Sequence, residues 1–145
     1  MAVDGIPIVE AVLKLAMLTM IGLYFVFSNT VMNVLKRSDN GAVVMVEINK
    51  QIINPVFLLF FMGSAIASLY FILFGNTGDI VAGVVFLLGT TFVTVIKNVP
   101  LNKTLQSEHG QTNSPNYWQI YLEKWTFWNN IRTVAAIMTG FLLVL

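Results

Sequence analysis

The side chains with the greatest capacity for chemistry in this sequence are one glutamate, one arginine, and a group of asparagines and tryptophans beside long apolar stretches. Glu47 and Arg132 are the charged members and our candidate catalytic residues. A carboxylate that is shielded from water becomes a stronger base, and a guanidinium stabilises a developing oxyanion. Carboxamides add hydrogen-bond donors, and indoles offer flat faces to an aromatic ligand. The candidate binding residues are Asn33, Asn54, Asn98, Asn102, Trp125, Trp128 and Asn129.

Helical spacing arranges these side chains in stripes. Asn29 and Asn33 are four residues apart and share a helix face, whereas Asn98 and Asn102 share one only if Pro100 does not end their helix. Two longer stripes consist of Glu47, Gln51 and Asn54, and of Tyr121, Trp125, Trp128, Asn129 and Arg132. Each stripe lies at the end of an apolar stretch. If successive helices alternate in direction, the stripes meet near one leaflet and enclose a polar pocket.

Four apolar stretches must position these stripes. The chain is 57% hydrophobic and 10% charged, whereas about a quarter of the residues of a soluble domain are charged. Its mean hydropathy is +0.77. We therefore predict a multi-pass integral membrane protein with an all-α fold, an antiparallel four-helix transmembrane bundle with long first and second helices. Residues 1–145 form one domain in this prediction, with helices at about 6–35, 42–74, 80–98 and 115–145.

Local signals set the expected helix ends. The first stretch has no cleavage pattern of a secretory signal, so we expect a retained helix, in which Glu10 and Lys14 can pair. Pro100 should end or kink the third helix, and a polar loop should follow from Lys103 to Asn113. The fourth helix should start at Ser114–Pro115, a typical N-cap followed by proline.

The distribution of positive charge predicts the orientation. Nearly all Lys and Arg residues flank the first and third connections, which places those connections in the cytoplasm and both termini on the non-cytoplasmic side. A charged side chain in hydrocarbon costs roughly 2.5 to 3.5 kcal/mol even on lenient insertion scales, so such residues usually turn inward and find partners. The hypothesis to test is that Glu47 pairs with Arg132 inside the bundle.

Composition also excludes several classes of function. The net charge of +1 leaves no basic surface for nucleic acid. Without cysteine, and with His109 as the single histidine, the chain has too few ligands for a haem or a multi-histidine metal site. We expect no metal and no cofactor. Membrane lipids are the expected partners, and small residues four apart, such as Gly63 and Ala67, are compatible with a homo-oligomer.

Three segments resemble a known family. Asn98-Val99-Pro100-Leu101-Asn102 closes the third stretch, and Trp125-x-x-Trp128-Asn129-x-x-Arg132-Thr133 opens the fourth. Residues 49–55 have the form Asn-x-x-Ile-x-Asn-Pro. In these motifs, and in the order and spacing of its spans, the chain resembles the anthrone oxygenase-like family of small four-helix membrane proteins, formerly a domain of unknown function.

The resemblance implies a cofactor-free oxygenase that converts an anthrone to an anthraquinone. Glu47 would then be the base and Arg132 the oxyanion clamp, with Asn98, Asn102 and Asn129 as further donors and Trp125 and Trp128 stacking on the substrate. One position departs from the pattern. Many members place a histidine directly after the Trp-Asn pair, and this chain has Asn130 there. If that histidine accepts a proton in those members, this chain lacks the group.

Other interpretations remain open. The same pocket suits a non-catalytic membrane protein that binds a lipid, a quinone or a partner helix. A purely structural role is a third candidate. The asparagines and tryptophans are also compatible with an ordinary interface, wetted by headgroups and ringed by an aromatic belt, with no pocket at all. The substrate and the oligomeric state do not follow from these patterns.

Overall fold

The computed structural model describes residues 6–109 and 117–145, and these residues are almost entirely helical, with no strand among them. Four helical stretches are long and apolar enough to cross a membrane, as expected of an integral membrane protein. They are Pro7–Arg37, Pro55–Phe74, Thr77–Glu108 and Tyr117–Val144. The predicted all-α class and the four candidate spans are therefore confirmed.

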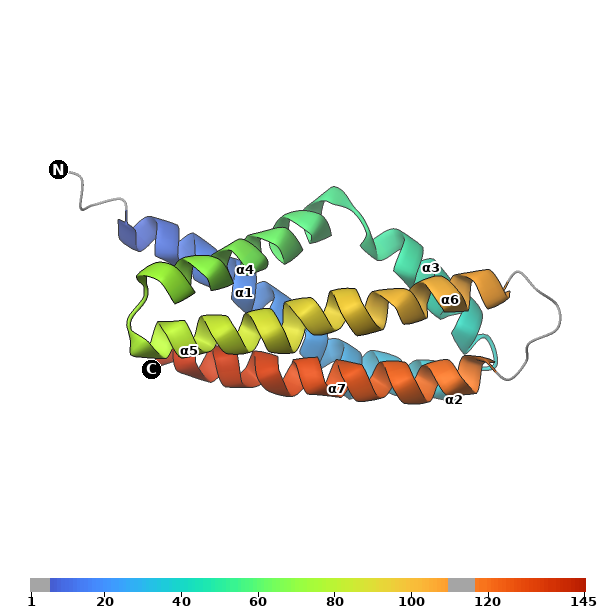
Figure 1. Cartoon of the computed structure of the whole chain (residues 1–145). Helices are drawn as coiled ribbons and strands as arrows, with labels where there is room; N and C mark the ends of the chain where they lie inside the picture. Colours follow the sequence, from blue (N-terminus) through green and yellow to red (C-terminus); the bar gives the residue numbers. More distant parts are fainter. Residues whose placement is uncertain (1–5, 110–116) are drawn as a thin grey trace.

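Two of these spans are built from several helical segments each (Figure 1). The first comprises α1 (Ile6–Val26), the π-helical η1 (Phe27–Val31) and α2 (Met32–Arg37). The third comprises α5 (Thr77–Phe86), the π-helical η2 (Leu87–Phe92) and η3 (Thr94–Asn98), and α6 (Val99–His109). The short α3 (Gly41–Ile52) precedes the second span, α4 (Pro55–Phe74), and the fourth span is α7 (Tyr117–Val144).

The predicted single helix at 42–74 is wrong, because the chain breaks between α3 and α4 at Ile53 and Asn54. Pro55 disfavours a helical backbone at the residue before it, and Asn54 is extended, with φ −121° and ψ 164°. The Asn54 side chain then caps α4, since its Oδ1 accepts a hydrogen bond from the Phe57 N–H at 3.0 Å. The sequence Asn-Pro thus ends one helix and starts the next.

The third helix runs further than predicted. It does not end near Asn98, and residues 103–109, expected to be a loop, belong to α6. Pro100 is only the second residue of α6, and the π-helical η2 and η3 precede it. Such π-helical turns occur where an α-helix takes up an irregularity in its hydrogen bonding, so the helix passes the proline. The rest of the predicted loop, with the start expected at Ser114–Pro115, lies outside the described residues.

Two apolar cores lie along the length of the molecule. One is formed by α1, α4, α5 and α7 around Met17, Phe71 and Phe86. The other core lies toward the end of the molecule where α3 and α6 are found (Figure 1), around Met45, Leu105 and Tyr121. α7 contributes to both, contacting α5 through its later half and α6 through its first half. The polar residues of interest lie where the two cores meet.

At the end of the molecule away from α3 and α6, the structure forms an ion pair, the one found among residues 6–109 and 117–145. Lys14 Nζ lies 3.9 Å from Asp79 Oδ1, so the predicted pairing of Lys14 with Glu10 is wrong. Glu10 instead accepts a 3.5 Å hydrogen bond from the Tyr70 hydroxyl. Asp79 also completes a capping box with Asn76 at the start of α5. At this end, the charged groups Glu10, Lys14 and Asp79 of the described residues thus each contact a polar or charged partner.

Candidate functional site

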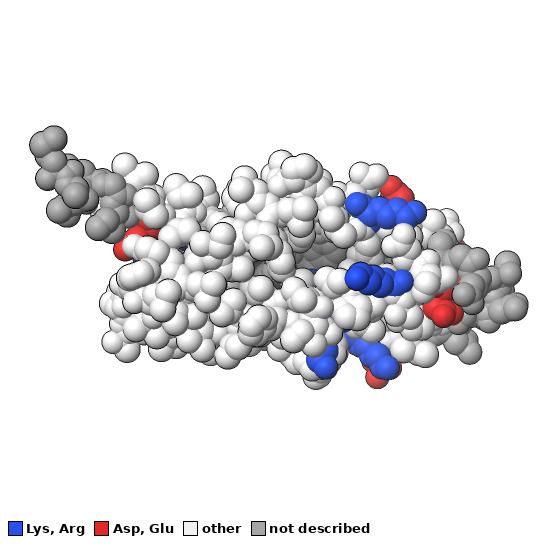
Figure 2. All heavy atoms as spheres, turned by 45° about the horizontal axis from the view of Figure 1, so that its top comes forward, with Lys and Arg blue, Asp and Glu red and all other residues white. Residues whose placement is uncertain are grey.

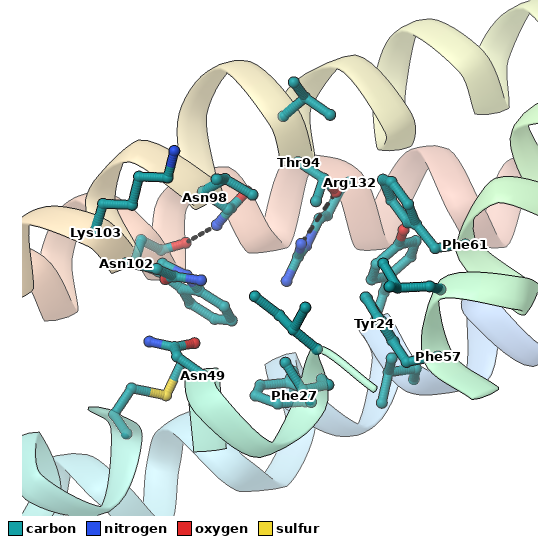
Figure 3. A pocket seen from close by; sticks show the side chains of 18 of the residues that line it. Tyr24, Phe27, Asn49, Phe57, Phe61, Thr94, Asn98, Asn102, Lys103 and Arg132 are labelled. Carbon is teal, nitrogen blue, oxygen red and sulfur yellow. Dashed lines mark hydrogen bonds between the residues drawn. The ribbon is translucent and has the colours of Figure 1, made fainter. Parts of the chain in front are cut away.

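A cavity of about 240 Å³ lies at the junction of the two cores. Its walls come from every span and from α3. One side is apolar and aromatic, with Phe27, Phe57 and Phe61. The opposite side carries polar groups from η3, α6 and α7 (Figure 3). A cavity with one aromatic and one polar wall suits a flat ligand that has a polar group at one edge.

Arg132 is the charged group at the centre of this site. Its side chain is 6% exposed, and Figure 3 shows the guanidinium pointing from α7 into the cavity. The Nε–H donates to Asn129 Oδ1 at 2.7 Å, and Nη1 donates to Thr94 Oγ1 at 3.1 Å. The guanidinium carbon lies 4.6 Å from the centre of the Tyr24 ring and 5.0 Å from that of Trp125. Two rings and two hydrogen bonds therefore fix this cation in place.

Asn129 contacts Arg132 but does not itself line the cavity. It is fully buried, and while its Oδ1 accepts from Arg132, its Nδ2 donates to the Ser28 hydroxyl of η1. Ser28 Oγ in turn lies 2.7 Å from Thr133 Oγ1. This buried chain of hydrogen bonds joins the first span to the fourth at the depth of the cavity. It fixes the orientation of the guanidinium, because the amide oxygen of Asn129 cannot rotate without giving up Ser28.

The predicted pair between Glu47 and Arg132 does not form. Glu47 is exposed on α3, and its Oε1 accepts a 2.8 Å hydrogen bond from Gln51 Nε2. It does not line the cavity. Within the described part of the chain, no carboxylate forms an ion pair with Arg132. A buried cation without a carboxylate partner is costly unless another anion or a set of dipoles compensates it.

Four further polar atoms beside the cavity have no hydrogen-bond partner among the described residues. They are the Tyr24 hydroxyl, Asn49 Nδ2, Asn98 Oδ1 and Trp125 Nε1, and all four residues line the cavity. A buried polar group left unpaired costs about 1–3 kcal/mol. These four polar atoms surround one cavity, beside a cation that has no carboxylate partner, and this arrangement is expected of a site that receives a polar ligand.

A comparison with known protein families identifies the family of this chain. A family model described as anthrone oxygenase matches residues 44–142, more than half of the sequence. The chain belongs to the anthrone oxygenase family. The predicted resemblance is confirmed. No curated protein and no solved structure matches the sequence. The family match runs from within α3 to near the end of α7, so it includes Asn49, Asn98 and Arg132 but not Tyr24 of α1.

Four of the predicted site residues of this anthrone oxygenase family member meet at the cavity. Asn98 is 1% exposed and donates from Nδ2 to the Trp125 carbonyl at 3.3 Å. Asn102 Oδ1 accepts a 2.8 Å hydrogen bond from the Tyr121 hydroxyl. Because α6 continues past Pro100, Asn98 and Asn102 share a helix face. Asn98, Asn102, Trp125 and Arg132 all line the cavity.

The other predicted residues lie elsewhere. Asn33 is exposed and lines a separate surface groove between α2 and α7. Asn54 caps α4, as described above, and does not line the cavity. Trp128 lies outside it too, with Lys97 Nζ 4.8 Å from the centre of its ring. Asn129 acts through Arg132 and is not a wall of the cavity, and Asn130 is exposed on α7.

Three buried or half-buried polar residues that line the cavity were not among the predicted ones. Tyr24 lies inside an apolar stretch, and Ser28, its polar neighbour at helical spacing, belongs to none of the predicted stripes. Thr94 gives no distinct signal, because a threonine within a helix commonly bonds back to a carbonyl of its own helix, and its Oγ1 does donate to the Thr90 carbonyl at 2.8 Å. Asn49 had a signal, because it begins the Asn-x-x-Ile-x-Asn-Pro motif. No group of three His, Cys, Asp or Glu side chains suited to a metal ion occurs in residues 6–109 and 117–145.

Proposed function

We propose that this chain is a membrane-embedded, cofactor-independent oxygenase that binds a flat aromatic acid of the anthrone type as its anion in the cavity around Arg132. The observation that carries the proposal is the buried guanidinium without a carboxylate partner, surrounded by unpaired polar atoms. In this proposal the four spans cross the membrane as an antiparallel bundle with both termini on the non-cytoplasmic side. The site then lies near the cytoplasmic leaflet.

The physical basis is that an anthrone is a weak carbon acid. Loss of one proton gives an anion whose charge is spread over the ring system and its oxygen. A fixed cation in a site of low dielectric constant stabilises that anion strongly relative to the neutral acid. Asn49 Nδ2 and Trp125 Nε1 are unpaired donors beside the same cavity. The rings of Phe27 and Trp125 would lie against the flat faces of the ligand.

The reaction balances with dioxygen as the only oxidant. The bound anion transfers electrons to O₂ and forms a C–O bond, giving a peroxide at the former CH₂ carbon. That carbon then loses its remaining hydrogen as a proton while the O–O bond breaks, which leaves a ketone and releases one molecule of water. Both protons removed from carbon end in that water. The protein's tasks are to hold the anion, orient it and exclude bulk water.

The structure changes one role in the mechanism expected from the sequence. Glu47 lies outside the cavity, so its assignment as base is not retained. Arg132 promotes the first deprotonation by stabilising the anion, whichever group accepts the proton. Asn98 and Asn102 form the polar wall, and Asn129 keeps the guanidinium aimed at the ligand.

The test uses the full chain in lipid nanodiscs with a hydroxyanthrone and air-saturated buffer. Formation of anthraquinone is followed by its absorbance and oxygen uptake by electrode. Replacement of Arg132 by Gln should lower kcat by a factor of about 10²–10³, as for loss of one oxyanion donor. Lys97→Gln removes an exposed cation of η3 and is the control. Full turnover by the Arg132→Gln protein would refute the assignment.

A second candidate is a binding protein that holds a quinone or lipid-like anion without turnover. Among the described residues that line the cavity, none is an aspartate, glutamate or histidine. That observation favours binding over proton transfer. Gentle extraction in native nanodiscs followed by mass spectrometry of co-purifying small molecules distinguishes the two. An aromatic acid that stays unchanged under oxygen would favour the binding protein.

A further inference from the structure

The cavity reaches the outer surface between the second and third spans. α4 packs against η2, and α3 packs against α6. Between these two contacts the chain breaks at Ile53 and Asn54. Three apolar residues at this level line the cavity and are also exposed on the outside of the molecule: Ile53 at 67%, Leu58 at 42% and Val95 at 51%. The opening therefore has an apolar rim.

The length of α4 indicates the depth of this opening. Its 20 residues extend about 30 Å at 1.5 Å per residue, which equals the thickness of the hydrocarbon core of a bilayer. Because α4 begins at Pro55, directly after the break, the opening lies at the edge of the hydrocarbon region. Figure 2 shows a recess midway along this face of the molecule, beside a group of Lys and Arg side chains. An apolar rim next to cationic side chains is typical of the boundary between acyl chains and headgroups.

We propose that the cavity takes its ligand sideways from one leaflet, through a mouth formed by Ile53, Leu58 and Val95. The ligand class is then an amphiphile dissolved in the bilayer, with a flat apolar body and one acidic oxygen. Its identity as an oxygenase substrate depends on the proposed function, but the route does not. The route suits the walls of the site, since an apolar body passes from lipid to Phe57 and Phe61 while its acidic edge reaches Arg132.

The competing route comes from water. Lys103 and Gln106 also line the cavity, are exposed, and lie on the α6 side, toward the end of the molecule away from α4. A ligand that dissolves in water would enter between these two polar side chains and α3. The two routes predict different effects of blocking each rim, so one experiment separates them.

The experiment exploits the absence of cysteine from the chain. Val95→Cys places a single thiol on the mouth, and Ile96→Cys places one on the adjacent residue, which is 60% exposed but does not line the cavity. Each variant, in phosphatidylcholine nanodiscs, is treated with benzyl methanethiosulfonate, which partitions into lipid, and later with dithiothreitol. Modification at Val95→Cys should lower kcat/KM for a hydroxyanthrone by about tenfold or more, and the reductant should restore it. The same treatment of Ile96→Cys should change it by less than about twofold.

A second pair of variants repeats the comparison without chemical modification. Leu58→Trp narrows the mouth from α4, whereas Leu59→Trp adds the same bulk to an exposed neighbour outside the cavity. Only Leu58→Trp should lower kcat/KM for the hydroxyanthrone. Equal effects of the two variants would contradict the mouth, because general disturbance of α4 would then explain both.

A third measurement needs no turnover, and it separates failure of the route from failure of the proposed function. The rate of thiol labelling is followed by intact-protein mass, with the benzyl reagent and with its water-soluble trimethylammonium counterpart. Val95→Cys should react faster with the benzyl reagent. A thiol on the mouth that reacts as fast with the charged reagent would show that the opening faces water and would overturn the proposal. So would retention of kcat/KM after modification at Val95→Cys, or a block produced at Gln106→Cys alone.

Discussion

The guanidinium carbon of Arg132 lies 4.6 Å from the centre of the Tyr24 ring. This contact joins α7 to α1 across the cavity. Arg132 lies within the segment matched by the anthrone oxygenase family model, whereas Tyr24 lies before it. The cation that we expect to bind the ligand is therefore positioned partly by a span outside the family match. Mutations on the first span should therefore affect the site.

Replacement of Asn129 by Leu should destabilise the protein and weaken the site together. The change removes the acceptor for Arg132 Nε and the donor to Ser28, both of them buried. Leaving such groups unpaired costs about 1–3 kcal/mol each. We expect a lower midpoint of thermal unfolding in detergent and a lower kcat. Asn130→Leu is the matched control, because Asn130 is exposed on the same helix. Similar losses in both variants would mean that the buried hydrogen bonds contribute little.

Gly89→Ala should loosen the packing of the third span on the fourth. A Cβ at residue 89 would meet the Cβ of Ala135 on α7 too closely for both to stay in place. Forcing extra volume into a packed contact typically costs about 1–3 kcal/mol. Gly22→Ala is the control, since a Cβ there has nothing within 4 Å, and alanine in a helix should add about 0.5–1 kcal/mol of stability. The two midpoints of thermal unfolding should move in opposite directions.

Asn54→Ala should weaken the start of α4 beside the mouth. The variant loses the hydrogen bond from the Phe57 N–H and the one that Asn54 Nδ2 donates to the Gln51 carbonyl at 3.0 Å. Loss of an N-cap costs about 1 kcal/mol. Asn40→Ala is a close control, because Asn40 precedes α3 in the same way but its side chain makes no capping hydrogen bond. Hydrogen exchange at the first turn of α4 should rise in Asn54→Ala only. Unchanged exchange there would show that Pro55 fixes the break without help.

The features of this structure that follow from neighbouring residues in the sequence could be predicted, whereas those that depend on how the helices pack could not. The four spans follow from runs of apolar residues, and Arg132, Asn98 and Trp125 follow from the cost of placing polar groups in such runs. Glu47 was expected in the pocket, but Asn49 on the same short helix lines the cavity instead. Two residues apart, their side chains differ by about 200° around the helix axis, and only the packing of α3 decides which faces inward.

The error on α3 also has a physical source. Glu47, Gln51 and Asn54 form a stripe only if one helix runs through all three, and the proline after Asn54 breaks that helix. The continuation past Pro100 was not predicted, because spacing does not reveal the π-helical η2 and η3, which precede the proline and contact α7. Prolines at residues 55 and 100 thus have opposite effects in one chain.

Tyr24→Phe should separate ligand binding from stability. The Tyr24 hydroxyl is buried and has no hydrogen-bond partner among the described residues, so its removal relieves an unpaired polar group. The ring, and with it the contact with Arg132, remains. We therefore expect a midpoint of thermal unfolding without ligand that is unchanged or higher, since deleting an unpaired buried group saves about 1–3 kcal/mol. If the hydroxyl bonds to the ligand, affinity for a hydroxyanthrone should fall by about tenfold, as for the loss of one hydrogen bond of about 1.4 kcal/mol. Tyr121→Phe provides the contrast, because the Tyr121 hydroxyl already donates a hydrogen bond to Asn102 Oδ1. Its removal should lower the stability of the protein without ligand. A Tyr24→Phe protein that is less stable without ligand and binds it normally would place this hydroxyl in the framework of the bundle and not in the site.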